Sequence, residues 1–201
     1  MIRSPQFILG LTGSIAMGKT TVANMFRDIG VPVWCADKEV NKLYSKDGEA
    51  TKIFTKEFPN VVTETGIDKN QLRTLIHEDN NILRKVEKIV HPLLHKSKAD
   101  FIERNQKSPI IIFDIPLLFE KNQERNFDAV VVVTASEVTQ KNRVLKRENM
   151  SEKDFLLIKR NQLSEEKKLK RADFVINTDK VLLETRRDVQ ELYKKIKDLM
   201  D

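Results

Sequence analysis

A glycine-rich loop between an apolar run and a helical pattern constrains this chain more than any other feature. The segment FILGLTGSIAMGKTTVANMF, residues 7–26, begins with six residues typical of a buried strand. The loop Gly13–Thr20 then fits the spacing G-x-x-x-x-G-K-[ST]. In such a loop the glycines let successive N–H groups turn toward phosphate oxygens, and the helix that follows presents its positive N-terminal end. The sequence therefore predicts a loop that binds nucleotide phosphates.

Two side chains of this loop carry the chemistry that phosphate binding needs. The motif places Lys19 where its ammonium reaches the β- and γ-phosphates of a nucleotide. It places the hydroxyl of Thr20 where it can ligate Mg²⁺.

Further apolar runs resemble the first and predict strands of the same kind. Short runs rich in Val and Ile, separated by helical patterns, indicate a parallel sheet that is covered on both faces. We therefore expect an α/β fold, a three-layer α/β/α sandwich of the P-loop NTPase type. The expected strands are 7–12, 31–36, a part of 108–118, 127–135 and 172–178, and the expected helices include 20–29, most of 38–58, and about 180–200.

Two helical stretches interrupt this alternation. Residues 63–107 follow one helical pattern with another and show no strand, and residues 137–171 are helical and basic. Ligands bind at the carboxyl ends of parallel strands, so insertions after strands would overhang them. We predict one domain over residues 1–201, with a helical acceptor lobe at about 63–107 and a basic lid at about 137–171.

The charge of the chain is concentrated in the second of these stretches. Residues 137–171 hold eleven Lys/Arg and six Asp/Glu, which is +5 of the net +6. Such a stretch fits a solvated helix face, a nucleic-acid surface, or a kinase lid that grips phosphates. No apolar run approaches the ~18 residues of a membrane span. The absence of room for a signal peptide before residue 7 and the single Cys35 lead us to expect a cytoplasmic protein without disulfides.

Three classes of nucleotide protein could carry such a loop. A GTPase would carry Asn-Lys-x-Asp, and the nearest string, NTDK at 177–180, has the wrong order. A nucleic-acid-dependent ATPase is disfavoured by an aromatic content of 6%, which offers few platforms for stacking bases. A small phosphotransferase explains both helical stretches, because one would hold the acceptor and the other would close over the donor phosphates.

Several side chains could serve such a transfer, and each has a simpler alternative. Asp37 follows the second expected strand and could orient an acceptor hydroxyl, or it could cap a helix that starts at Lys38. Arg143 and Arg147 are spaced i, i+4, so we expect both on one helix face, as lid cations or as ordinary surface residues. Arg160 and Lys168 are weaker candidates of the same kind. His91, before a proline, is read from the residues alone as the end of a helix.

The order of several motifs resembles the dephospho-coenzyme A kinase family over nearly the whole chain. The matching strings are GLTGSIAMGKTTVA, VPVWCAD, VEKIVHPLLH, DIPLLFE, RVLKR and NQLSEEKKLKRADFVINT. The P-loop in the first string is shared by many families, whereas HP, PLLFE and AD-x-V-I-N in this order and spacing are far more specific.

The resemblance implies an activity and a set of roles. Members phosphorylate the ribose 3′-hydroxyl of dephospho-CoA with ATP and Mg²⁺, the last step of CoA synthesis. It implies Asp37 as the base or orienting group for that hydroxyl and Arg143 and Arg147 as lid cations. Asp114 is a further carboxylate that could lie near the metal. The resemblance assigns ATP phosphates to Gly13, Ala16, Met17, Gly18, Lys19, Thr20 and Thr21, and the CoA side to His91, Pro92, Pro116, Leu117, Leu118, Phe119 and Glu120.

The chain departs from the family pattern at three places. The family usually has glycine at Ala16 and an aspartate at Cys35. It often has an arginine just before the glutamine that corresponds to Gln162, or four residues before it, and this chain has Asn161 and Ile158 at those positions. These departures bear on efficiency, since Lys19 and Asp37 are present.

Two rival functions remain open at this point. One is another small-molecule kinase of the same fold, acting on a nucleoside or nucleotide. The other is a nucleic-acid-binding ATPase or regulator that uses residues 137–171 on a phosphate backbone. For the kinase we expect a small-molecule partner, no nucleic-acid or membrane partner, and a monomer or weak homo-oligomer.

Overall fold

The computed structural model describes residues 6–147 and 150–200. Within the chain, residues 35–104 form one compact unit, and the stretches before and after them form another. No helix among the described residues is long and apolar enough to cross a membrane.

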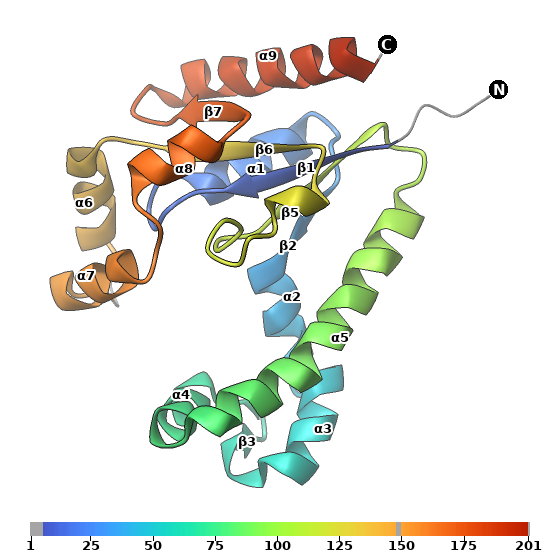
Figure 1. The fold of residues 1–201 in the computed structure, drawn as a ribbon, viewed down its shortest axis with the longest axis vertical. Coiled ribbons are helices and arrows are strands. Elements are labelled where there is room, and N and C mark those ends of the chain that lie inside the picture. Colours follow the sequence, from blue (N-terminus) through green and yellow to red (C-terminus); the bar gives the residue numbers. More distant parts are fainter. Residues whose placement is uncertain (1–5, 148–149, 201) are drawn as a thin grey trace. The chain divides into compact units, whose positions relative to one another are not determined.

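A five-stranded parallel sheet organises the unit built from the two outer stretches (Figure 1). The strand order is β2-β5-β1-β6-β7, so β1 lies at the centre and pairs with β5 on one side and β6 on the other. This confirms the predicted α/β fold and each predicted strand. The bounds are β1 Phe7–Thr12, β2 Val33–Cys35, β5 Ile110–Asp114, β6 Ala129–Thr134 and β7 Phe174–Asn177.

One face of the sheet is covered by two helices, α1 (Lys19–Asp28) and α9 (Leu182–Met200). Figure 1 shows α9 lying along the sheet beside β7. The two helices pack against each other as well as against the strands. Alternate strand residues face this core, as the pleat of a strand requires. The core includes Leu9, Leu11, Ile110, Ile112, Val131, Val133, Val22, Phe26, Val189 and Ile196.

The other face is closed by aromatic side chains and by the chain that follows β5. The rings of Trp34 and Phe113 lie 5.5 Å apart, and those of Phe113 and Phe127 lie 5.9 Å apart. A Cβ on Gly10 would lie 2.8 Å from Cδ1 of Leu118 and 3.1 Å from the Phe127 ring. Glycine at position 10 therefore lets these side chains close directly onto the central strand.

Three helices occupy the basic stretch, as predicted: α6 (Glu137–Leu145), α7 (Glu152–Arg160) and α8 (Glu165–Arg171). The expectation that Arg143 and Arg147 share one helix face is wrong, because α6 ends before Arg147. A capping box between Ser151 and Asp154 starts α7 a few residues later.

The second unit has its own apolar core, formed where four helices meet. These are α2 (Ala36–Leu43), α3 (Glu49–Glu57), α4 (Lys69–Glu78) and α5 (Asn80–Arg104), and the predicted helical character of 38–58 is confirmed. Their contacts bury a core that includes Leu43, Phe54, Phe58, Leu72, Val86 and Val90.

The prediction that no strand lies within 63–107 is wrong in one small part. Two-residue strands, β3 (Val62–Thr63) and β4 (Gly66–Ile67), pair in an antiparallel hairpin. Its turn is stabilised by the Thr63 hydroxyl, which donates to the Gly66 carbonyl oxygen at 2.9 Å, and by Gly66, whose φ of 121° a side chain would strain.

The reading of His91 as a helix end is also wrong, because α5 continues through Pro92 to Arg104. Proline lacks the N–H that would bond the carbonyl of Lys88 in a regular helix. Pro92 and Lys88 are both exposed, so water can satisfy that carbonyl.

Pro92→Ala should therefore stabilise the second unit. The substitution restores the helical N–H and removes the ring, a gain of about 2 kcal/mol after the extra freedom of the unfolded chain is subtracted. Urea unfolding followed by circular dichroism measures the change. The control His95→Ala, at another exposed position of α5, should stay within about 0.5 kcal/mol. Equal stability of the proline variant and wild type would contradict this account of α5.

Candidate functional site

The phosphate loop leaves β1 at the carboxyl edge of the sheet and enters α1. Two of its residues have left-handed backbones, Ala16 with φ 61° and Gly18 with φ 91°. Such alternation turns backbone N–H groups into a shared concavity, the geometry that binds anions. Gly13 lies so close to β6 that a Cβ would come 2.5 Å from the carbonyl oxygen of Val133. The glycine at position 13 is therefore required by the packing of the loop against the sheet.

Packing of the Ala16 side chain offsets the strain of its left-handed backbone. Its methyl group joins a small apolar cluster with Val144 of α6 and Phe155 of α7, and Ile15 and Met150 pack against the same cluster. The side chain is 9% exposed. Contact with α6 and α7 thus accommodates an alanine at this left-handed position.

Lys19 and Asp114 form an ion pair at the carboxyl edge of the sheet. Asp114 ends β5 and lies beside Leu11 of β1 in the strand register, so the sheet brings the carboxylate next to the loop. Both side chains are largely buried, at 13% and 4% exposed. The loop lysine is therefore held at the strand ends by a carboxylate that sequence reasoning had placed near a metal.

The start of α1 supplies the remaining donors. The first N–H groups of a helix have no partner within it, and in α1 these belong to Lys19, Thr20 and Thr21. Thr20 and Thr21 are exposed, so their hydroxyls are accessible to a ligand at this helix end. Hydroxyl and carboxylate oxygens are donors that suit Mg²⁺, which is commonly held by one or two carboxylates together with substrate phosphates.

Side chains from residues 137–171 hold the outer part of the loop. Gln140 of α6 donates its amide N–H to the Ile15 carbonyl at 2.8 Å, and Gln162 accepts the Ile15 N–H at 3.0 Å. Ser14 donates its hydroxyl to Glu165 of α8 at 2.9 Å. Sequence reasoning gave none of these side chains a role, because they lie 125 to 151 residues from their partners.

Arg143 reaches the loop from α6 by way of Thr178, the residue that follows β7. Its guanidinium donates to the hydroxyl and to the carbonyl of Thr178, at 2.8 and 2.7 Å, and makes a long 3.5 Å contact with the Ala16 carbonyl. Arg143 thus lies against the loop, whereas Arg147 and Arg160 are exposed. Sequence reasoning missed Thr178, although its place just beyond a strand end is the same signal that drew attention to Asp37.

Lys168 is fully buried, at 0% exposed, and its ammonium lies 3.0 Å from the carboxylate of Glu120. The same carboxylate oxygen accepts the N–H of Leu163 at 2.8 Å. The second oxygen of Glu120 has no hydrogen-bond partner among the described residues. The Lys168 ammonium likewise forms no hydrogen bond with the described residues, so its contact with Glu120 is an ion pair only. This ion pair joins α8 to the segment after β5.

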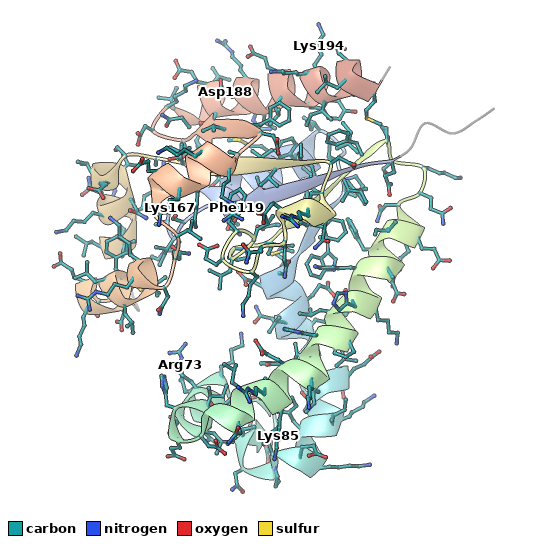
Figure 2. The ribbon with its side chains drawn as sticks, viewed as in Figure 1. Arg73, Lys85, Phe119, Lys167, Asp188 and Lys194 are labelled. Atoms are coloured by element: carbon teal, nitrogen blue, oxygen red, sulfur yellow. The ribbon has the colours of Figure 1, made fainter. Side chains whose placement is uncertain are left out.

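That segment, residues 115–123, shows which of its members can meet a ligand. Leu118 and Phe119 are completely buried, whereas Leu117 is 39% exposed. Figure 2 marks Phe119 on this segment, and the guanidinium of Arg171 from α8 lies 4.8 Å from the centre of its ring. Pro116 is partly buried, and its carbonyl accepts the Thr12 hydroxyl at 3.1 Å. Pro116 and Leu117 are therefore the more accessible members, and Leu118 packs inside.

Asp37 and His91 belong to the second unit. Asp37 is exposed in the first turn of α2, where a carboxylate interacts favourably with the helix dipole. The alternative that it caps a helix starting at Lys38 is wrong, because α2 begins at Ala36 and its N-cap is Cys35. His91 is exposed on α5.

The family model CoaE, described as dephospho-CoA kinase, matches residues 7–184. A relative from Bartonella henselae named dephospho-CoA kinase is 44% identical over 191 residues, which cover 94% of this chain and 97% of that protein. The chain belongs to the dephospho-CoA kinase family.

Two solved structures share the fold of this chain. A crystal structure of a protein from Thermus thermophilus superimposes with a TM-score of 0.83 at 29% identity, covering 94% of this chain and 97% of that one. A structure titled dephospho-CoA kinase from Campylobacter jejuni has a TM-score of 0.63 at 23% identity, covering 95% and 97%. At that identity the Campylobacter structure shows the shared fold alone.

Substitutions at Ala16 test the account of the loop in this family member. Ala16→Gly relieves a left-handed strain of about 1–2 kcal/mol. It also loses a buried methyl and adds freedom to the unfolded chain, each worth about 0.8 kcal/mol. The free energy of unfolding should therefore change by less than about 1 kcal/mol. Ala16→Val places a β-branched residue at positive φ and should lose about 2 kcal/mol or more in urea unfolding. Equal effects of the two substitutions would contradict the assigned backbone.

Lys168→Met should destabilise the protein by about 3–5 kcal/mol, because it leaves the Glu120 carboxylate without its buried countercharge. Changing both residues, Lys168→Met with Glu120→Gln, should recover much of the loss. Lys170→Met is the matched control, because Lys170 and its partner Glu166 are both exposed. This substitution should lower the free energy of unfolding by no more than about 1 kcal/mol. Urea unfolding measures all three, and similar losses at positions 168 and 170 would show that the buried pair is not special.

Proposed function

We propose that this protein transfers the γ-phosphoryl group of ATP to the ribose 3′-hydroxyl of dephospho-CoA, producing CoA and ADP. Membership of the dephospho-CoA kinase family and a P-loop of matching geometry support this function. The ion pair between Lys19 and Asp114 at the carboxyl edge of the sheet is the observation that most directly supports the phosphate-binding part of this proposal.

The donor side follows from the geometry of the loop. Phosphate oxygens compete with Asp114 for the Lys19 ammonium, and the start of α1 supplies further N–H donors. Lys19, Arg143 and Arg147 would then balance the charge of the phosphoryl group during transfer. Gly13 and the residues Ala16 to Thr21 form the nucleotide site in this proposal.

Mg²⁺ is the metal that these donors fit. The Thr20 hydroxyl and the Asp114 carboxylate are hard oxygen donors beside the loop, and they would hold the ion together with the phosphates. When bound there, such an ion would offset the negative charge of the phosphates during transfer.

The acceptor side rests on the family resemblance. Asp37 would orient the 3′-hydroxyl and accept its proton as the oxygen bonds to the γ-phosphorus and the bond to the β-phosphate oxygen breaks. His91, Pro116, Leu117 and Leu118 would line the CoA side, with the exposed Leu117 in contact and the buried Leu118 fixing the segment.

The proposal extends to the surroundings of the enzyme. We infer a cytoplasmic protein that works as a monomer or weak homo-oligomer, with a small-molecule partner and neither nucleic acid nor membrane as partner. Analytical ultracentrifugation checks the oligomeric state. Nucleic-acid binding that weakens steeply with salt, together with stimulated ATP hydrolysis, would favour the rival regulator instead.

The direct test is a panel of acceptors in a coupled ADP-release assay with MgATP. Dephospho-CoA should release ADP, and adenosine, nucleoside monophosphates and shikimate should release little more than the blank. ADP release only with one of these other acceptors would keep the phosphate loop and overturn the assignment of dephospho-CoA.

Asp37→Asn should lower kcat by about 10²–10⁴-fold while the protein stays folded, because an amide cannot accept the hydroxyl proton. Asp47→Asn is the control, since Asp47 is an exposed carboxylate of the same unit. It should leave turnover within about twofold, as expected for a surface substitution. Near-normal turnover of the Asp37 variant in the same assay would refute its role.

A further inference from the structure

We propose that Gln140 and Thr178 are positioning residues that hold the phosphate loop ready for ATP by binding its carbonyl groups. This inference rests on the proposed function, because it concerns the affinity of the same site for ATP. The two side chains come from different parts of the chain, 125 and 161 residues away from the carbonyls that they bind.

The hydrogen bonds are short and well placed. The Gln140 amide donates to the Ile15 carbonyl at 2.8 Å, and the Thr178 hydroxyl donates to the Met17 carbonyl at 2.8 Å. Both side chains are buried, at 1% and 5% exposed. Buried hydrogen bonds between fixed groups hold a backbone orientation better than exposed ones, because water does not compete for them.

Because the peptide bond is planar, holding a loop carbonyl also fixes the direction of the N–H group that follows it. In a planar trans peptide the carbonyl and the following N–H point in opposite directions. A carbonyl of Ile15 held by Gln140 therefore directs the N–H of Ala16 the other way, and a carbonyl of Met17 held by Thr178 does the same for the N–H of Gly18. These N–H groups belong to the part of the loop that would cradle phosphates.

Thr178 is itself held in place on two sides. Its hydroxyl accepts from Arg143 at 2.8 Å and donates to the Met17 carbonyl at 2.8 Å, which is nearer than its second acceptor, the Thr134 carbonyl at 3.3 Å. The next residue, Asp179, accepts the N–H and the hydroxyl of Ser136 at the start of α6, at 2.8 and 3.1 Å. The Thr139 hydroxyl, together with these bonds from Ser136, holds the pKa of Asp179 below its ordinary value. The threonine is thus fixed from both the lid helix and the strand end.

The loop has little room to adapt if the hydroxyl is lost. A Cβ at Gly18 would lie 3.0 Å from the Thr178 hydroxyl, so the Thr178 side chain already packs closely against the backbone of Gly18. Without the hydroxyl, the Met17 carbonyl loses the bond that holds its orientation, and the peptide can rotate. Rotation would turn the Gly18 N–H away from the phosphates, and ATP binding would have to restore it.

The experiment compares Thr178→Val, which keeps the shape and removes the hydroxyl, with Thr178→Ser, which keeps the hydroxyl. Calorimetry with MgATP and no acceptor measures the Kd, and the coupled assay measures the KM for each substrate. Thr178→Val should weaken ATP binding about tenfold or more, while the KM for dephospho-CoA stays within about twofold. Thr178→Ser should bind ATP within about twofold of wild type.

Two further variants keep the test decisive. Thr185→Val removes another buried hydroxyl, which donates at 3.4 Å to the carbonyl of Val181, the residue just before α9, and it should leave ATP binding unchanged. Gln140→Met removes the second carbonyl contact with little change in length and should also weaken ATP binding. It provides the test if Thr178→Val proves unfolded by circular dichroism.

The outcomes separate this inference from the proposed function. Normal ATP affinity in both Thr178→Val and Gln140→Met, with an active wild type, would overturn the inference alone. Equal losses in Thr178→Val and Thr185→Val would also overturn it, since the effect would then be general. A wild-type protein that neither binds ATP nor releases ADP would overturn the proposed function and this inference with it.

Discussion

The outward orientation of the loop carbonyls is the constraint on which the phosphate site depends. A loop whose N–H groups face inward must turn its carbonyls outward, and buried carbonyls need donors. In this protein the donors come from α6 and from the end of β7, while β6 fixes the start of the loop by its close approach to Gly13. The central position of β1 in the sheet makes this possible, because strand ends and lid helices then surround one loop.

The basic side chains of residues 137–171 fall into two groups, one exposed to solvent and one facing the protein interior. Exposed lysines pair with glutamates across the lid helices, as in Lys141 with Glu152 and Lys159 with Glu137. Arg143 and Lys168 instead lie inward, where one meets the loop and the other meets Glu120. A local net charge of +5 is therefore a poor guide to partners, since part of it is used in internal contacts.

The sequence predicted the strands well because each is a continuous apolar run, and it predicted the loop because the motif is local. The predictions from sequence were wrong where a single residue decides whether a helix ends or continues. Pro92 lies inside α5 because the helix face around it is exposed, and Arg147 falls outside α6 because the next helix cap follows soon after. Gln140, Glu165 and Thr178 could not be predicted, because their roles come from contacts across more than a hundred residues.

The most direct measurement is the position of the new phosphate on the product. The protein is incubated with MgATP and dephospho-CoA, and the product is analysed by mass spectrometry and ³¹P NMR. The account predicts a gain of one phosphoryl group as a monoester on the ribose 3′-oxygen, with one ADP formed for each. A phosphoryl group at another position, or ADP without a phosphorylated product, would contradict it.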